Sequence, residues 1–278
     1  MQVVLTEKRD RVLTVTLNRP QSRNALNRAL MRAVWNAVAA AGDDPETDAV
    51  IVTGADPAFS AGTDLKEVAG QPTPQAAPEA ASRTGASQGE SENRDGPFRD
   101  KNGLYRFLPV IDKPVIGAVN GVAVTGGLEL ALQCHFLVAS ERARFADTHA
   151  RVGVMPGGGI TVLLAQSVGL RRAIEMSLTG NFVTAEQAYH LGLVNHVVPH
   201  DELLPAARTL AADIVSNDQQ AVRELVRHYR KVANAATLDE AHLLEGILAE
   251  TWTPGTSRVG ERRAAVTERG RAQAKGSS

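Results

Sequence analysis

This chain of 278 residues has only one cysteine and no excess of either charge. The single cysteine, Cys134, excludes an internal disulfide, and with no second cysteine and scattered histidines the sequence argues against a zinc site. We expect Cys134 to be a buried core thiol rather than a nucleophile. The formal net charge of −1 gives no electrostatic basis for binding nucleic acid or an anionic membrane.

Long apolar runs and an N-terminal leader pattern are also missing. No uninterrupted apolar run reaches transmembrane length. Met1–Thr6 is followed at once by Glu7, Lys8 and Arg9, which is unlike a secretory signal peptide. Hydrophobic residues make up 43% of the chain and charged residues 22%, which is ordinary for a globular protein. We therefore predict a cytoplasmic globular protein with a substantial core.

The N-terminal part alternates strand and helix patterns. Val12–Leu17 alternates apolar and polar residues, and Ala49–Thr53 is short and apolar, so both are expected strands. Between them we predict a helix capped by Asn24 and running to about Ala41. This order favours a parallel crossover. Residues 70–100 are rich in Pro, Ala, Ser, Gly and Glu, so we expect a mobile or disordered loop there.

Shorter patterns continue to the C-terminal end. We expect strands over Phe136–Ala139, Ala143–Phe145 and Leu193–Val198, and helices over about Ile160–Val168, from Thr184 to near Gly192, and over 202–215, 219–234 and 237–252. The chain then divides into a core (1–200), a helical region (201–252) and a basic polar tail (253–278). This tail either stays solvated or docks on a partner subunit.

The most informative stretch is KPVIGAVNGVAVTGGLELAL, residues 113–132. Pro114–Val119 is typical of a buried strand, and Gly126-Gly127 opens a helix whose first turn carries Glu129. Glycines at a helix start let a substrate oxygen approach unpaired N–H groups and the positive end of the helix dipole. A carboxylate beside such a turn suits chemistry that moves a proton while N–H donors hold an oxyanion.

A second turn, FSAGTDLK over Phe59–Lys66, follows the Ala49–Thr53 strand. Its Thr63 N–H could point into a cleft, although the segment is also consistent with an ordinary turn between a strand and a helix. Two such turns could converge two N–H donors on one carbonyl oxygen, which is what an enolate-forming enzyme needs.

Several motifs, taken together, resemble the enoyl-CoA hydratase/isomerase (crotonase) family over about residues 3–250. The motifs are LNRP from Leu17 with NAL from Asn24, then FSAGTDLK, KPVIGAVNGVAVTGGLELAL, Phe145 with VGVMPGGG, and LTGNFVTAEQAYHLGLVNHVVP over 178–199. They occur in the family's order and spacing. The resemblance implies a crotonase-like α/β fold, a spiral of ββα units with a C-terminal helical region that helps to form homotrimers or hexamers (dimers of trimers). It also implies acyl-CoA thioester substrates and no cofactor beyond the coenzyme A of the substrate.

The resemblance further assigns roles by position. The N–H groups of Thr63 and Gly126 are expected to form the oxyanion hole for the thioester oxygen. The neighbourhood Ala61–Lys66, which includes Ala61, Asp64, Leu65 and Lys66, is expected to line the CoA site with Gly126. Arg23 is either a ligand of the CoA phosphates or a solvent-exposed residue.

For hydration, the family uses two carboxylates that hold one water. Glu129 matches the first of them, but His149 stands where hydratases commonly carry the second glutamate. An imidazole can accept or donate a proton near neutral pH, although it lacks the two acceptor oxygens of a carboxylate. A single histidine is also often a packed or surface residue, and Asp147 is a candidate for orienting it. His135 departs from the family as well, without a predicted role.

Three hypotheses remain open from the sequence. The first is an enoyl-CoA hydratase-like lyase in which Glu129 and His149 handle water and proton. The second is an isomerase, or another reaction of the family, that uses Glu129 alone. The third is a non-catalytic acyl-CoA binder that keeps the oxyanion turns.

Overall fold

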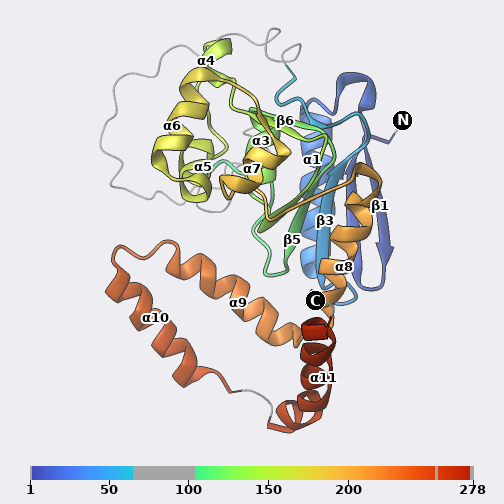
Figure 1. Cartoon of the computed structure of the whole chain (residues 1–278), viewed down its shortest axis with the longest axis vertical. Helices are drawn as coiled ribbons and strands as arrows, with labels where there is room; N and C mark the ends of the chain where they lie inside the picture. The colour runs from blue at the N-terminus through green and yellow to red at the C-terminus, as the bar shows by residue number, and fades with distance from the viewer. Residues whose placement is uncertain (1, 65–103, 254–255, 276–278) are drawn as a thin grey trace, which may run out of the picture. The chain divides into compact units, whose positions relative to one another are not determined.

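The computed structural model describes residues 2–64, 104–253 and 256–275. Its larger sheet has six strands in the order β1-β2-β3-β5-β7-β10 (Figure 1). Their bounds are β1 Val4–Arg9, β2 Val12–Leu17, β3 Ala49–Gly54, β5 Val115–Val119, β7 Phe136–Ser140 and β10 His196–Val198. β1 is antiparallel to β2, and the other pairs are parallel. The predicted parallel crossover between Val12–Leu17 and Ala49–Thr53 is therefore confirmed.

A smaller sheet has the order β4-β6-β8-β9. Its strands are β4 Ala58–Ser60, β6 Val122–Val124, β8 Arg144–Ala146 and β9 Val183–Thr184. β4, β6 and β8 each follow a strand of the larger sheet, namely β3, β5 and β7. The chain thus passes from the larger to the smaller sheet three times, which is the expected ββα repeat.

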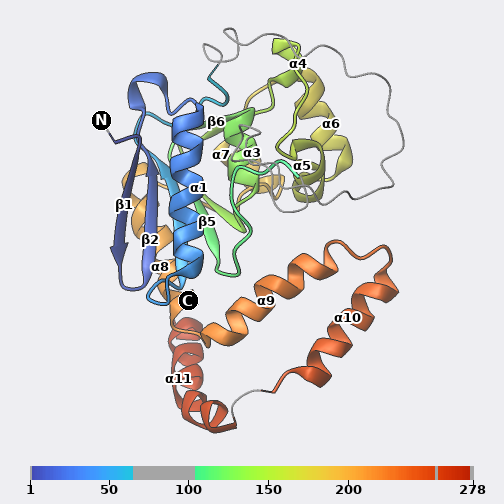
Figure 2. The ribbon, with the colours of Figure 1, turned by 180° about the vertical axis from the view of Figure 1, so that it is seen from behind.

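Helices cover both faces of the larger sheet. Helix α1 (Arg28–Asp43) and helix α8 (Leu203–Val215) lie on opposite faces, as Figures 1 and 2 show. Alternate strand residues point to the two sides: Val50 and Val52 join the α1 core, whereas Ala49 and Ile51 pack with α8. This alternation is the period-2 pattern of the strand sequences.

The predicted cap of α1 is wrong by three residues. Asn27 is the cap, and its side chain accepts a hydrogen bond from Leu30 N. Asn24 is instead buried, and its side-chain amide donates to Ala55 O and Ala58 O. Through these two bonds Asn24 ties the turn before α1 to the segment that leads into β4, and its own buried amide group is satisfied.

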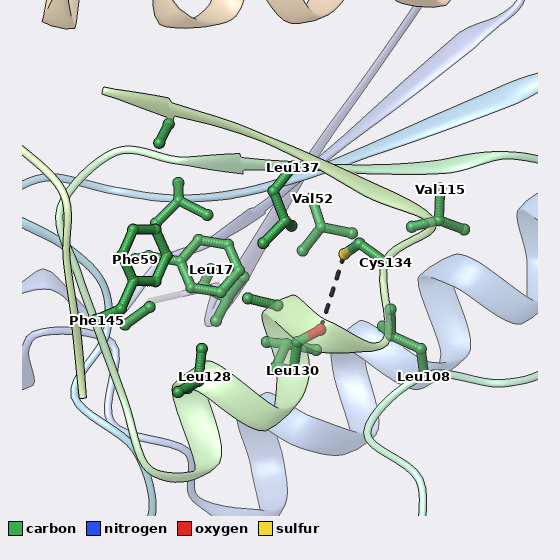
Figure 3. Close-up of a cluster of buried hydrophobic side chains, with 14 of the residues drawn as sticks. Leu17, Val52, Phe59, Leu108, Val115, Leu128, Leu130, Cys134, Leu137 and Phe145 are labelled. Atoms are coloured by element: carbon green, nitrogen blue, oxygen red, sulfur yellow. Dashed lines mark hydrogen bonds between the residues drawn. The ribbon is translucent and has the colours of Figure 1, made fainter. Parts of the chain in front are cut away.

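The core between the two sheets is apolar and holds the cysteine. Figure 3 shows Leu128 and Leu130, from helix α3 (Gly126–Leu132), in one cluster with buried side chains of the strands. Cys134 lies beside them, with its Sγ 3.8 Å from Leu130 O (Figure 3). Burial raises the pKa of this thiol to about 12. The prediction of a buried core thiol is confirmed.

The remaining helices of this part are short. They are α4 His149–Val152, α5 Ile160–Val168, α6 Leu170–Thr179 and α7 Ala185–His190, with 3-10 turns at Pro20–Ser22 and His200–Glu202. α5 has the predicted bounds, whereas α4 and α6 were not predicted. Thr184 caps α7 with a capping box that includes Gln187.

The chain divides into two compact units, Met1–Arg223 and Glu224–Ser278. Helix α9 (Gln219–Val232) crosses the boundary, and α10 (Leu238–Thr251) and α11 (Thr256–Lys275) follow. The helices predicted over 219–234 and 237–252 are thus present. The tail beyond residue 253, for which no helix was predicted, contains α11. Among the described residues, no helix combines the length and apolar character needed to cross a membrane. The loop predicted over 70–100 lies outside the described residues.

Candidate active site

The turn before α3 is strained and well held. Thr125 adopts φ 53° and ψ −114°, a conformation that residues with a branched side chain rarely adopt. Its N–H donates to Ala146 O at 2.9 Å, and its hydroxyl is hydrogen-bonded to the hydroxyl of Thr148. Gly126 follows as the first helical residue, where the N–H has no partner inside the helix.

The turn that carries Thr63 runs beside this helix start. Leu26 N donates to Gly62 O at 2.7 Å, and Asp64 N donates to Leu26 O at 3.0 Å. Because these contacts use one side of the extended chain, the N–H of Thr63 faces the other side. A Cβ atom placed on Gly126 would lie 3.4 Å from Thr63 N. The structure therefore brings together the two residues expected to form the oxyanion hole.

Glu129 is almost fully buried, with 3% of its surface exposed. Its Oε1 accepts a hydrogen bond from Gly158 N at 2.8 Å. Burial raises the pKa of Glu129, against the opposing effects of His149 and of hydrogen bonds from the backbone of Gly158 and Ile160. A carboxyl group with a raised pKa keeps its proton up to a higher pH than an exposed glutamate does, and it can act as a general acid or base.

His149 lies opposite Glu129, at the first residue of α4, and is 7% exposed. Its Nε2 is 3.9 Å from Glu129 Oε2, and its Nδ1 is 2.6 Å from Asp147 Oδ1. Burial opposes the ionisation of Asp147, but hydrogen bonds from His149 and Ser177 outweigh that effect and lower its pKa. The chain thus forms a row of Asp147, His149 and Glu129, with a gap between the last two.

This gap opens into a cavity of about 350 Å³. Its lining includes Thr63, Thr125, Glu129 and His149, together with Ala61, Thr148, Arg106, Gly157, Gly158 and the apolar or aromatic side chains of Met31, Tyr105, Phe107, Val152, Val154 and Met155. The predicted proton-moving pair and one predicted oxyanion donor therefore share one mostly apolar cavity, the kind of site that small molecules occupy.

The residues expected at the CoA site have different surroundings. Ala61 and Arg23 are exposed neighbours, because Ala61 N donates to Arg23 O at 2.9 Å. Asp64 accepts two hydrogen bonds from the guanidinium of Arg19, both at 3.0 Å. Leu65 and Lys66 lie outside the described residues.

Sequence reasoning missed several parts of the site. The N–H of Gly158, which holds Glu129, lies in a glycine-rich turn that was recognised without a role. The aromatic side chains of Tyr105 and Phe107 line the cavity from a segment where no motif was found. His135, which had no predicted role, is structural: its Nδ1 accepts from Val115 N at 2.9 Å at the start of β5. Within the described ranges, no group of three or more metal-binding side chains is arranged to hold an ion.

Comparisons with known proteins agree with this architecture. A family model described as enoyl-CoA hydratase/isomerase matches residues 7–273. A probable enoyl-CoA hydratase of Mycobacterium tuberculosis is 35% identical over 249 residues, which are 90% of this chain and 87% of the relative. The crystal structure of an enoyl-CoA hydratase from that species has 46% identity and a TM-score of 0.71, covering 88% of this chain and 98% of the other. A monofunctional enoyl-CoA isomerase from M. smegmatis has 27% identity and a TM-score of 0.67, covering 87% and 99%. The chain therefore belongs to the enoyl-CoA hydratase/isomerase family and has the crotonase fold.

Proposed function

We propose that this protein is an enoyl-CoA hydratase-like hydro-lyase that adds water across the double bond of a trans-2-enoyl-CoA. The observation that carries the proposal is the separation of 3.9 Å between Glu129 Oε2 and His149 Nε2 at the wall of the cavity. One water can make hydrogen bonds of ordinary length, about 2.8 Å, to both atoms across such a gap. Two groups that hold one water can deliver its oxygen to the β-carbon and manage both protons.

The thioester oxygen is stabilised by the N–H groups of Thr63 and Gly126. Addition of water to the β-carbon places negative charge on this oxygen, as an enolate, until the α-carbon receives a proton. Two preorganised N–H donors lower the energy of that enolate more than the energy of the neutral thioester. The contact between Thr63 and Gly126, and the strained Thr125 that fixes the turn, support this role.

The CoA portion lies against the turn that carries Thr63. We assign Ala61, Asp64, Leu65 and Lys66 to its binding site together with Gly126, and Arg23 to its phosphates. The adjacency of Arg23 and Ala61 supports the last assignment, since it puts an exposed arginine beside the turn. The reaction uses no cofactor beyond the coenzyme A of the substrate.

A panel of substrates tests this function. Crotonyl-CoA and longer trans-2-enoyl-CoAs are supplied, and loss of the conjugated absorbance is followed with mass spectrometry of the product. Conversion to a 3-hydroxyacyl-CoA at one or more chain lengths is expected. No turnover at any chain length, by protein that still binds CoA thioesters in calorimetry, would contradict the proposal.

A second candidate is an isomerase that moves a double bond with Glu129 as its only base. It is favoured by the burial of Glu129 and by the similarity to a monofunctional enoyl-CoA isomerase. This version predicts that a 3-enoyl-CoA is converted, that Glu129→Gln is inactive and that His149→Ala is tolerated. It is the weaker candidate because an isomerase with one base assigns no role to His149, whose Nε2 faces Glu129 across the gap.

We further propose that the chain assembles as a homotrimer or a hexamer. Helix α10 contains no buried residue, and its Leu238, Leu243 and Ile247 are 72%, 65% and 48% exposed. Large apolar side chains on an unburied helix are typical of a surface that pairs with another subunit. The cytoplasmic location stays a prediction.

A further inference from the structure

The contact between Asp147 and His149 decides which nitrogen of the imidazole faces the cavity. Asp147 is 2% exposed, and its Oδ1 lies 2.6 Å from His149 Nδ1 and 3.2 Å from the backbone N of His149. The lowered pKa of Asp147 makes it a carboxylate, which accepts hydrogen bonds and donates none. The hydrogen bond at Nδ1 therefore requires the proton to be on Nδ1.

A neutral imidazole that carries its proton on Nδ1 has a free lone pair on Nε2. That atom lies 3.9 Å from Glu129 Oε2, across the gap that opens into the cavity. Histidine side chains otherwise prefer the tautomer with the proton on Nε2, which would point a donor at this gap. Asp147 thus reverses the ordinary preference and turns the ring into an acceptor on the cavity side.

We propose that Asp147 is a positioning residue that makes His149 Nε2 the acceptor of the water proton and leaves Glu129 as the donor to the α-carbon. The assignment rests on the hydratase function proposed above. The surroundings of Glu129 agree with it, because burial raises the pKa of this carboxyl and so favours its protonated form. Hydration needs one group that accepts a proton from the water and one group that donates a proton to the α-carbon. His149 and Glu129 then each carry out one of these two transfers.

The water oxygen forms a bond to the β-carbon while one O–H bond breaks and that proton goes to Nε2. The π electrons of the double bond move into the thioester, forming the enolate. The carboxyl group of Glu129 then gives its proton to the α-carbon and becomes a carboxylate, as the enolate collapses. Transfer of the proton from Nε2 to Glu129 restores the starting state, and Asp147 stabilises the imidazolium in between.

The tautomer can be observed directly in the unliganded protein. Nitrogen-15 NMR of histidine-labelled protein distinguishes the two ring nitrogens by their shifts, and His149→Gln identifies the His149 signals among the seven histidines. In the neutral ring we expect a protonated Nδ1 and a bare Nε2. In Asp147→Ala we expect the Nε2–H form to appear. Wild-type protein with the proton of His149 on Nε2 would overturn the proposal.

Kinetics separate positioning from a general loss of structure. Asp147→Ala is expected to lower kcat by about 100-fold, at the lower end of what a positioned general base contributes, with little change in KM. Asp147→Asn keeps a side-chain oxygen that can accept from the backbone N and from Nδ1 of His149, but it loses the negative charge. Its kcat should therefore lie between those of the wild type and Asp147→Ala. Unchanged kcat in Asp147→Ala would refute the role. Failure of the hydratase function is recognised separately, as absence of turnover in wild-type protein whose NMR shows the expected tautomer.

Discussion

At the scale of single residues, Glu129 and His149 are separated in the sequence by β7 and β8, and they face each other across 3.9 Å. The helix start after a buried strand indicates Glu129 as a candidate, whereas only the family resemblance, through the place of the second glutamate, indicates His149. The sequence could not predict the distance between them. That distance depends on how α3 and α4 emerge from β6 and β8, and on Gly158 N, which orients the Glu129 carboxyl.

The buried carboxyl of Glu129 makes a prediction about activity and stability together. Glu129→Gln should lower kcat by about 10²- to 10⁴-fold, because the amide cannot exchange the proton that a general acid or base transfers. In the wild type, the pKa of the Glu129 carboxyl is raised above the unfolded value of about 4.3, so the native state binds more protons than the unfolded state does. The stability contributed by this proton is complete below the unfolded pKa and is lost as the pH rises through the folded pKa.

Chemical unfolding of both proteins across pH measures this effect. Glutamine carries no charge at any pH, so Glu129→Gln should lose this part of the pH dependence. The difference in free energy of unfolding between the variant and the wild type should therefore shift in favour of the variant from pH 4 to pH 8. If the difference shifts in favour of the wild type at pH 8 instead, the buried carboxylate is well compensated and the expected rise in the pKa of Glu129 is contradicted.

At the scale of elements, the alternation of strand and helix, and most of their bounds, could be predicted from apolar periodicity. The exceptions have physical causes. Asn24 has the residue type of a helix cap, but its side-chain amide donates to the backbone carbonyls of Ala55 and Ala58 instead. Helix α4 is a single turn that begins at His149, which is too short for a periodic pattern to reveal.

The glycine-rich turn before α5 offers a matched pair of substitutions. A Cβ atom on Gly158 would overlap the ring of Phe107 and lie 2.9 Å from Glu129 Cδ, whereas a Cβ atom on Gly157 would meet open space. Gly158→Ala should therefore destabilise the fold by about 1–3 kcal/mol and lower kcat/KM, because it displaces groups that line the cavity. Gly157→Ala should be close to the wild type in both. Equal effects of the two substitutions, measured by urea unfolding and turnover, would contradict the proposed close packing around Glu129.

At the scale of the whole molecule, the exposed apolar side chains of α10 predict self-association. Light scattering coupled to gel filtration should give the mass of three or six chains of 29.5 kDa. Replacing Leu243 and Ile247 by glutamate should lower this mass, because two charges would have to be buried at the interface. His242→Glu, which adds a charge to the same helix at an exposed polar position, is the control and should keep the assembly. A single-chain mass for the wild type would refute the assembly.

The central claim is that Glu129 and His149 act as a unit on one water molecule. Hydration of crotonyl-CoA by Glu129→Gln, by His149→Ala and by the double variant tests it most directly, with acyl-CoA binding measured in parallel. Groups that act together are strongly non-additive, so each single variant should lose nearly as much kcat as the double variant. Wild-type hydration rates in His149→Ala, with Glu129→Gln inactive, would contradict the claim.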